Sequence, residues 1–220
     1  MFESKYSKVL TVILVIVIIA IVGLLAFLGY DLYQKYFLEN DAVAFVDNYG
    51  NDVTDESGDT NNTDNGDVNP LDELESVGGN SGAQSSVITY KGFVVVGTME
   101  MPAINFKYPI LEKVTKKSIE TSVAMLYGAG INQVGNTVII GHNYRNGLFF
   151  SNNKKLQVGD KIYVTDNSGN KLTYTIYNKF ETTPEDTSFY QRDTNGKPEI
   201  TLSTCTDDSS ARLIIFAKAE

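Results

Sequence analysis

Residues 199–217 have the sequence EITLSTCTDDSSARLIIFA, which gives the strongest indication of the fold in this chain. Two apolar runs rich in β-branched residues, typical of buried strands, are separated by the six residues from Thr206 to Ala211. If the runs form an antiparallel hairpin, Cys205 and Arg212 face each other at its open end, on strands about 5 Å apart. The stretch therefore predicts a hairpin that brings a thiol and a guanidinium together.

Comparable strand patterns occur throughout the segment from residue 86 to residue 220. The other predicted strands cover residues 92–101, 104–111, 136–140, 161–165 and 171–178, and the turn DNSGN at 166–170 joins the last two. Residues 115–127 are typical of one amphipathic helix that ends near Gly128, and residues 147–156 of a second short helical piece. Seven or eight short strands with little helix predict a mostly β fold, a closed or nearly closed β-barrel.

The N-terminal part of the chain has the pattern of a membrane anchor. Val9 to Leu28 is a run of 20 residues without a charge, and a helix of that length spans about 30 Å, the thickness of a bilayer's hydrocarbon core. The alternative is a cleaved signal peptide, but the run is longer than a typical signal core and no small-residue cleavage site follows it. Lys5 and Lys8 precede the run and acidic residues follow it. We therefore expect a single-pass protein of the cell membrane, with a cytoplasmic N-terminus and an extracellular C-terminal domain.

An acidic segment separates the anchor from the β-rich part. From Tyr36 to Tyr90 there are 12 acidic residues and no Lys or Arg, together with many Asn, Gly, Ser and Thr. Low hydrophobicity with charge of one sign predicts an extended, largely disordered linker. The expected organisation is a cytoplasmic N-terminus (1–8), a transmembrane anchor (9–28), an acidic, largely disordered extracellular linker (29–85) and a β-barrel (86–220).

Charge and composition exclude several classes of function. The formal net charge is −9, but residues 91–220 carry 15 basic and 13 acidic side chains and no basic stripe, so nucleic-acid binding has no support. A single cysteine excludes an intramolecular disulfide. One cysteine and one histidine also cannot build a zinc site of Cys and His ligands.

Three polar residues at the ends of apolar strands are candidates for chemistry: His142, Cys205 and Arg212. A thiolate is a nucleophile, an imidazole exchanges protons, and a guanidinium binds negative charge that develops on a carbonyl oxygen. Together they suit acyl transfer. Each also has a structural interpretation: Cys205 as a small buried hydrophobe, His142 as a structural residue, and Arg212 as a partner of Asp207 or Asp208.

The same residues resemble the sortases, the cysteine transpeptidases of Gram-positive bacteria. The run TLSTC at 201–205, followed seven residues later by Arg212, is similar to the sortase TLxTC…R signature, and VIIGHN at 138–143 resembles the strand that ends at the sortase histidine. The resemblance covers residue 93 to the C-terminus, and the order His, Cys, Arg agrees with it.

This resemblance implies an eight-stranded sortase β-barrel that cleaves an LPxTG-like sorting signal after its Thr. Cys205 would form the thioacyl enzyme, His142 would act as acid and base, and Arg212 would orient substrate and stabilise the oxyanion. Thr204 and Asn143 are further candidates for substrate contact. Partners would be secreted surface proteins that carry the signal, and an amine acceptor from a peptidoglycan precursor or a pilin lysine.

The subclass implied by the resemblance is mixed. TLSTC is similar to class B members, yet residues 179–199 are too short for the class B helical insertion, and the Asp-Pro-aromatic lid of class C does not occur. No metal or other cofactor is expected. Glu181, Glu185 and Asp186 could attempt the calcium binding of some class A enzymes, although solvated loop carboxylates are common.

Two other kinds of function compete with a sortase. An L,D-transpeptidase or an NlpC-like peptidase would also use a cysteine, but the former places His beside Cys and the latter places His after Cys, whereas here His142 precedes Cys205 by 62 residues in the order of the chain. The other alternative is a non-catalytic, membrane-tethered β-domain that binds wall polymer or a protein partner, with Cys205 buried and inert. Its thiol would resist alkylation until the protein unfolds.

Overall fold

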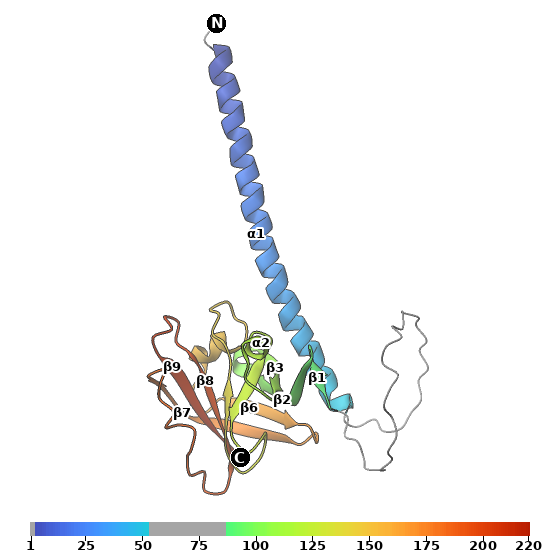
Figure 1. Cartoon of the computed structure of the whole chain (residues 1–220), viewed down its shortest axis with the longest axis vertical. Coiled ribbons are helices and arrows are strands. Elements are labelled where there is room, and N and C mark those ends of the chain that lie inside the picture. Colours follow the sequence, from blue (N-terminus) through green and yellow to red (C-terminus); the bar gives the residue numbers. More distant parts are fainter. Residues whose placement is uncertain (1–2, 53–86) are drawn as a thin grey trace, which may run out of the picture.

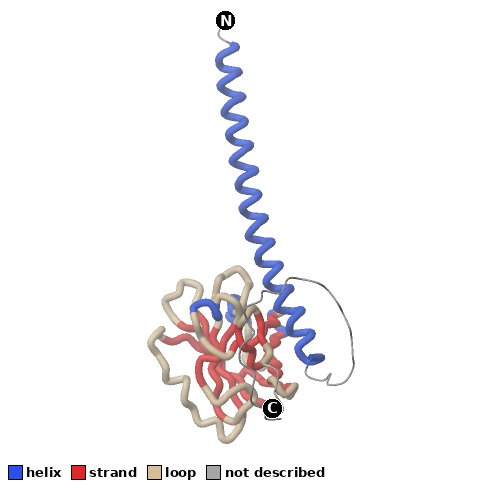
Figure 2. Tube along the Cα trace, turned by 45° about the vertical axis from the view of Figure 1, so that its right-hand side comes forward, coloured by secondary structure: helices blue, strands red, loops and turns tan. Residues whose placement is uncertain are grey.

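The strands of the C-terminal segment pair edge to edge until the sheet closes on itself. In the computed structural model, which describes residues 3–52 and 87–220, the strand order is β2-β3-β4-β5-β8-β9-β7-β6, and β6 pairs again with β2. A two-residue strand, β1 (Thr89–Tyr90), adds to β2 outside this ring. The prediction of a mostly β fold with an eight-stranded closed barrel is confirmed (Figures 1 and 2). The eight strands of the ring are β2 (Phe93–Met101), β3 (Phe106–Leu111), β4 (Val123–Tyr127), β5 (Gly135–Ile140), β6 (Lys161–Asp166), β7 (Lys171–Thr182), β8 (Pro198–Cys205) and β9 (Arg212–Ala219).

Two parallel pairings decide which strand ends come together. β3 pairs with β4, and β5 with β8, in parallel, whereas the other pairs of the ring are antiparallel. β5 and β8 therefore both end at one rim of the barrel, and β9 begins there. The interior is filled by apolar side chains from alternate strand positions, which fixes the register of each strand. Examples that are less than 2% exposed are Met99, Ile110, Ile139, Ile162, Ile176 and Ile200.

Three short helical pieces connect the strands: η1 (Pro102–Ile104), α2 (Lys116–Ile119) and η2 (Phe150–Lys155). η2 lies within the helical piece predicted over residues 147–156, although it is a 3₁₀ helix. The single helix predicted over 115–127 is wrong in its second half, because only 116–119 are helical and Val123–Tyr127 form β4. That strand fills the gap between β3 and β5, so tertiary hydrogen bonding outweighs the local helical pattern.

The N-terminal helix is longer than the sequence prediction. α1 runs from Glu3 to Asp52, through the predicted anchor and into the segment predicted as a linker. Of the described residues, its stretch from Val9 to Tyr49 contains the one helix that is long and apolar enough to cross a membrane. The expectation of an extended linker is therefore incorrect for residues 29–52. The rest of the predicted linker, residues 53–85, lies outside the described residues.

The C-terminal part of α1 packs on the side of the barrel (Figure 2). Ala42, Val46 and Tyr49 are buried, and Leu38 and Phe45 are partly buried against the same core. Their spacing of three or four residues places them on one face of the helix. The segment is therefore an amphipathic helix despite its acidic composition. Polar contacts flank this apolar stripe: Asp41 with Lys91 at 2.8 Å, Asp41 with the Tyr90 hydroxyl at 3.0 Å, Asp47 with Lys107, and Tyr49 with Asn167.

Candidate active site

The hairpin of β8 and β9 brings Cys205 and Arg212 into contact. The two residues are paired directly across the antiparallel strands. A guanidinium nitrogen of Arg212 donates a hydrogen bond to Cys205 Sγ over 2.7 Å. Cys205 is a free, partly exposed thiol. A positive charge that touches the sulfur stabilises negative charge on it, so the thiol is placed for nucleophilic chemistry.

The parallel pairing of β5 with β8 places His142 at the same rim. Ile140 is in register with Ser203, so His142 and Cys205 each lie two residues beyond that matched pair. His142, Cys205 and Arg212 line one pocket with a volume of about 240 Å³. The three residues predicted from the sequence are therefore brought together by the tertiary structure.

Glycine is required immediately before the histidine. A Cβ on Gly141 would lie 2.8 Å from Val123 Cγ1 and 3.0 Å from Phe150 Cδ2, distances too short for carbon atoms that do not move. The backbone therefore passes close to β4 and η2 before it reaches His142. After the histidine, the Phe150 amide donates to the His142 carbonyl at 3.0 Å, which closes the loop that carries the imidazole.

The surroundings of His142 favour its neutral form. Burial lowers the pKa of His142 below the ordinary histidine value, and the charge of Glu120 acts in the opposite direction. The imidazole also packs against the Tyr144 ring, with 4.9 Å between centroids and 31° between planes. A neutral imidazole next to the pocket can accept a proton during catalysis and return it to a leaving group.

Thr204 and Asn143, predicted to contact substrate, both connect the ends of β5 and β8. The Thr204 hydroxyl donates to the Gly141 carbonyl at 2.7 Å. The Asn143 amide donates to the Cys205 carbonyl at 3.0 Å and to the Asp207 carboxylate at 2.9 Å. These bonds hold the cysteine strand and the histidine strand in register, and substrate contact by either side chain stays a prediction.

The acidic residues after Cys205 have partners. Asp207 pairs with Lys154 at 2.5 Å, and the hydrogen bonds from Lys154 and Asn143 lower its pKa. Asp208 accepts hydrogen bonds from Thr206 and Ser210, which lower its pKa to about 2. Both carboxylates are therefore charged at neutral pH and engaged by neighbours other than the Cys205 sulfur.

The proposed calcium ligands do not gather around one point. The Asp186 carboxylate accepts hydrogen bonds from Thr182 and from the Ser188 amide, within its own turn. Within residues 3–52 and 87–220, no three His, Cys, Asp or Glu side chains come close enough to hold a metal ion.

The walls of the pocket come from residues that the sequence analysis did not identify. Ile119 of α2 and Leu126 of β4 form one side, and Pro184, Phe189 and Tyr190 of the connection between β7 and β8 form another. An apolar wall with the thiol at its end suits a peptide whose apolar side chain lies beside the scissile bond. These residues carry no motif, and only their aromatic and apolar character could have drawn attention to them.

The fold and the site together define a class: a closed β-barrel with a thiol, a guanidinium and an imidazole on one rim. The family model for the sortase domain matches residues 99–220, more than half of the chain. The chain belongs to the sortase family.

Individual relatives agree with this assignment. Sortase A of Bacillus anthracis is 32% identical over 124 residues, and sortase A of Streptococcus agalactiae serotype III is 30% identical over 139 residues. These matches cover 55% and 57% of this chain but only 58% and 53% of the two relatives, so the chain spans little more than half of their length.

Solved structures show the same likeness. Sortase A from Corynebacterium diphtheriae has a TM-score of 0.53 and 29% identity, over 58% of this chain and 61% of that one. A sortase D5 transpeptidase from Clostridium perfringens has a TM-score of 0.52 and 27% identity, over 58% of this chain and 79% of that one.

Proposed function

We propose that this protein is a membrane-anchored cysteine transpeptidase that cleaves an LPxTG-like sorting signal and transfers the acyl group to an amine. The observation that carries the proposal is the 2.7 Å contact between Arg212 and Cys205 Sγ, in a pocket that His142 also lines. Membership of the sortase family supports the same reaction class.

In the first half-reaction, the Cys205 thiol gives its proton to neutral His142, and its sulfur attacks the carbonyl carbon of the signal's Thr. The Arg212 guanidinium stabilises the oxyanion of the tetrahedral intermediate. When the peptide C–N bond breaks, His142 gives a proton to the leaving nitrogen, and a thioester on Cys205 remains. An inert buried cysteine would need neither a charged partner on its sulfur nor an imidazole in its pocket.

In the second half-reaction, an amine attacks the thioester carbon and His142 accepts its proton. The new amide bond forms as the Cys205 sulfur departs and takes the proton back from His142, which restores the free enzyme. We propose a peptidoglycan precursor or a pilin lysine as the acceptor, and surface proteins with the sorting signal as donors. Water in place of the amine would give hydrolysis. No metal or other cofactor takes part in these steps.

We propose that α1 anchors the protein, with the N-terminus in the cytoplasm and the barrel outside. Two observations support this orientation: the apolar helix is long enough to cross a bilayer, and Lys5 and Lys8 precede the apolar run whereas acidic residues follow it. Cysteine-scanning of the loop between β6 and β7 with an impermeant thiol reagent on intact cells, in a Cys205→Ala background, would label the barrel only if it lies outside.

The test of the reaction uses the full chain in detergent micelles, with mass spectrometry to follow a panel of LPxTG-type peptides. We expect an acyl adduct on Cys205 that an added amine discharges, no adduct in Cys205→Ala, and the same result with calcium or with a chelator. Arg212→Lys is the matched control for charge without the planar guanidinium, and we expect slower acylation.

The same experiment contains the test of the alternative function. If no peptide labels Cys205 and the thiol also resists alkylation in the folded protein, the transpeptidase proposal is wrong. The non-catalytic domain that binds wall polymer or a protein partner would then take its place. A reactive thiol separates the two, because a structural cysteine reacts only after unfolding.

A further inference from the structure

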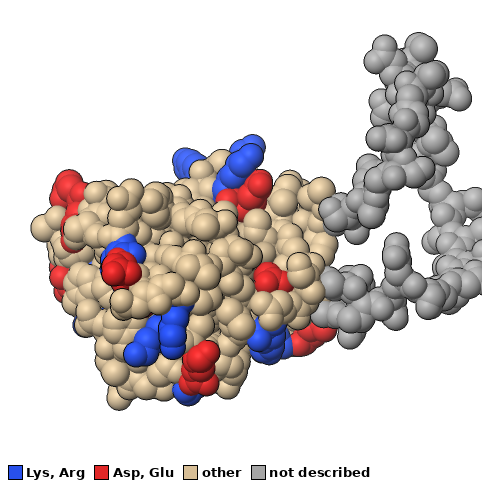
Figure 3. Space-filling model, turned by 90° about the horizontal axis from the view of Figure 1, so that it is seen from below, with Lys and Arg blue, Asp and Glu red and all other residues tan. Residues whose placement is uncertain are grey.

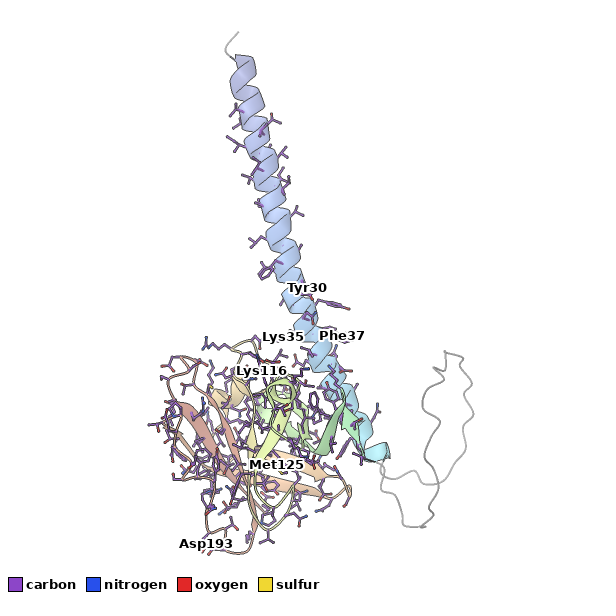
Figure 4. All side chains as sticks on the ribbon, viewed as in Figure 1. Tyr30, Lys35, Phe37, Lys116, Met125 and Asp193 are labelled. Carbon is purple, nitrogen blue, oxygen red and sulfur yellow. The ribbon has the colours of Figure 1, made fainter. Side chains whose placement is uncertain are left out.

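The docked part of α1 determines which end of the barrel points toward the apolar end of the helix. β8 runs from Pro198 to Cys205, so the connection before it and the catalytic rim after it lie at opposite ends of the barrel. Figure 4 places Asp193, in that connection, at the end remote from the helix N-terminus. The catalytic rim therefore lies at the end that faces the N-terminal half of α1.

A contact near the histidine fixes the level of this rim along the helix. The Lys35 amino group lies 2.9 Å from the position that a Cβ on Gly147 would take, so the loop that follows His142 lies against α1 at Lys35. In Figure 4, Lys116 of α2 lies near the level of Lys35 along the long axis of the molecule. One connection of the barrel thus reaches the helix at Lys35, and α2 lies near the same level.

That height is close to the end of the apolar run. Lys35 follows Leu28 by seven residues, which is about 10 Å along a helix. The headgroup region on each side of a bilayer is roughly 5 to 7 Å thick. Tyr30, Tyr33, Tyr36 and Phe37 around this level are exposed, as expected of aromatic side chains at a membrane interface. If Val9–Leu28 fill the hydrocarbon core, the catalytic rim begins where the headgroups end.

The loops of this rim carry exposed charges of both signs, because Glu120, Asp207 and Asp208 lie there beside basic side chains, and Asp207 is paired with Lys154. Lys116, Lys117 and Arg145 are exposed, and within the described part of the chain neither Lys116 nor Lys117 takes part in an ion pair. The opposite end of the barrel, seen in Figure 3, carries isolated acidic and basic side chains scattered over a largely uncharged surface. Basic side chains near an anionic bilayer are attracted to it within a Debye length.

We propose that the catalytic rim faces the bilayer and rests on its anionic headgroups through Lys116, Lys117 and Arg145. The docked segment of α1 holds the barrel in this pose through Asp41 with Lys91, Asp47 with Lys107, and the buried face around Ala42. The active site then opens at the membrane surface, where a peptide or amine attached to the bilayer reaches Cys205 without movement of the barrel. This inference rests on the proposed anchor, but not on the proposed chemistry.

Because the chain contains no Trp, single Trp reporters can test the pose. Lys116→Trp marks the catalytic rim and Asp193→Trp marks the remote end, about 26 Å away along an eight-residue strand. Each full-length variant is reconstituted in vesicles of phosphatidylglycerol and phosphatidylcholine that contain a lipid with a nitroxide on its headgroup. We expect Lys116→Trp to lose most of its emission and Asp193→Trp to keep most of it. Equal quenching of the two, or none of either, overturns the proposal.

A second pair of variants tests the role of the docked helix. Asp41→Lys with Asp47→Lys places like charges opposite Lys91 and Lys107, and we expect it to release the barrel and restore the emission of Lys116→Trp. Asn40→Lys with Asn48→Lys adds positive charge at exposed positions of the same helix and should leave the quenching unchanged. If Asp41→Lys with Asp47→Lys also leaves the quenching unchanged, the docking of α1 does not determine the orientation of the barrel. Peptide acylation in micelles is measured separately, so failure of the chemistry and failure of the pose give different results.

Discussion

His142 is the one histidine of the chain, so its protonation can be followed without interference from another imidazole. Burial lowers its pKa and Glu120 partly opposes this effect. We expect NMR titration of the full chain, carrying no histidine tag, to give a pKa below the ordinary value of about 6.5. Glu120→Gln should lower it further, because the charge that favours the imidazolium is removed. Glu112→Gln, in the same connection, is the control and should have no effect. A pKa above 6.5 would contradict this account.

The same shift predicts a pH dependence of stability. Since the folded state favours the neutral imidazole, the unfolded chain binds more protons once the pH falls below about 6.5. This histidine therefore makes the free energy of unfolding decrease as the pH falls through that value. His142→Gln should show a smaller decrease between neutral and mildly acidic pH, measured by urea unfolding. An identical decrease in both proteins would assign the effect to other groups.

Thr204 tests how the catalytic strands are held together. Thr204→Val keeps the side-chain shape but leaves the Gly141 carbonyl without its donor, which should lower the free energy of unfolding by about 1 to 3 kcal/mol. Because Gly141 precedes His142, we also expect slower acylation of Cys205. Thr204→Ser keeps the hydroxyl and serves as the rescue variant. If the Val and Ser variants behave alike, the hydroxyl does not position the histidine strand.

At the level of elements, the connection between β7 and β8 depends on a partly buried arginine, Arg192. Arg192 donates to Glu199 at 2.7 Å, to Asn136 at 2.8 Å and to Tyr177, and it lies over the Phe216 ring at 3.7 Å. Asn136 in turn donates to the carbonyls of Phe189 and Tyr190 at 3.0 and 2.9 Å. These bonds attach the connection, and with it one wall of the pocket that Cys205 lines, to the outside of the barrel.

Arg192→Met should therefore affect both stability and substrate binding. It removes the cationic partner of the buried Glu199 carboxylate and leaves the Tyr177 hydroxyl as its side-chain donor, which costs about 3 to 5 kcal/mol. It also loosens the wall that contains Phe189 and Tyr190. We expect a lower free energy of unfolding in urea and a higher KM for peptide. Adding Glu199→Gln removes the unpaired charge and should recover part of the stability. No recovery in the double variant would show that the ion pair is not the source of the loss.

The local pattern of an element did not always decide its conformation. In the structure a capping box at Thr115 begins α2, but the chain leaves the helix after Ile119 because β3 and β5 need a strand between them. In residues 29–52 the error was the opposite. The acidic composition predicted a linker, but the segment is helical. Its apolar face, which includes Ala42 and Tyr49, is buried against the barrel.

At the scale of the whole molecule, the apolar face of α1 around Ala42 packs on the barrel, so the barrel and the C-terminal part of α1 share one core. Phe45 packs on Tyr90 with 4.9 Å between ring centroids, and Ala42 is 1% exposed. Ala42→Glu should therefore lower the free energy of unfolding by roughly 2 to 4 kcal/mol, because it buries an unpaired charge and adds volume to a closed contact. Ala44→Glu, at an exposed position of the same helix, should change it little. Equal effects of the two would show that the helix does not dock.

Truncation checks the same conclusion. A segment that begins at residue 87 lacks Phe45, which packs on Tyr90, whereas a segment that begins at residue 31 retains this contact. We expect the shorter segment to have a lower Tm and to self-associate in sedimentation experiments, because an apolar patch becomes exposed. If the two segments have equal Tm values and are both monomeric, the folded domain begins at β1 and does not include the end of α1.

The sequence alone determined the class of fold, the hairpin that pairs Cys205 with Arg212, and the identity of the three candidate catalytic residues. Strand alternation, the short connection and the TLSTC run are local in the chain, so they could be recognised without coordinates. The tertiary structure alone decided the apolar walls of the pocket, the Arg192 network and the docking of α1. Those features join residues far apart in the chain, such as Asn136 with Arg192, and depend on which surfaces remain uncovered once the barrel has closed.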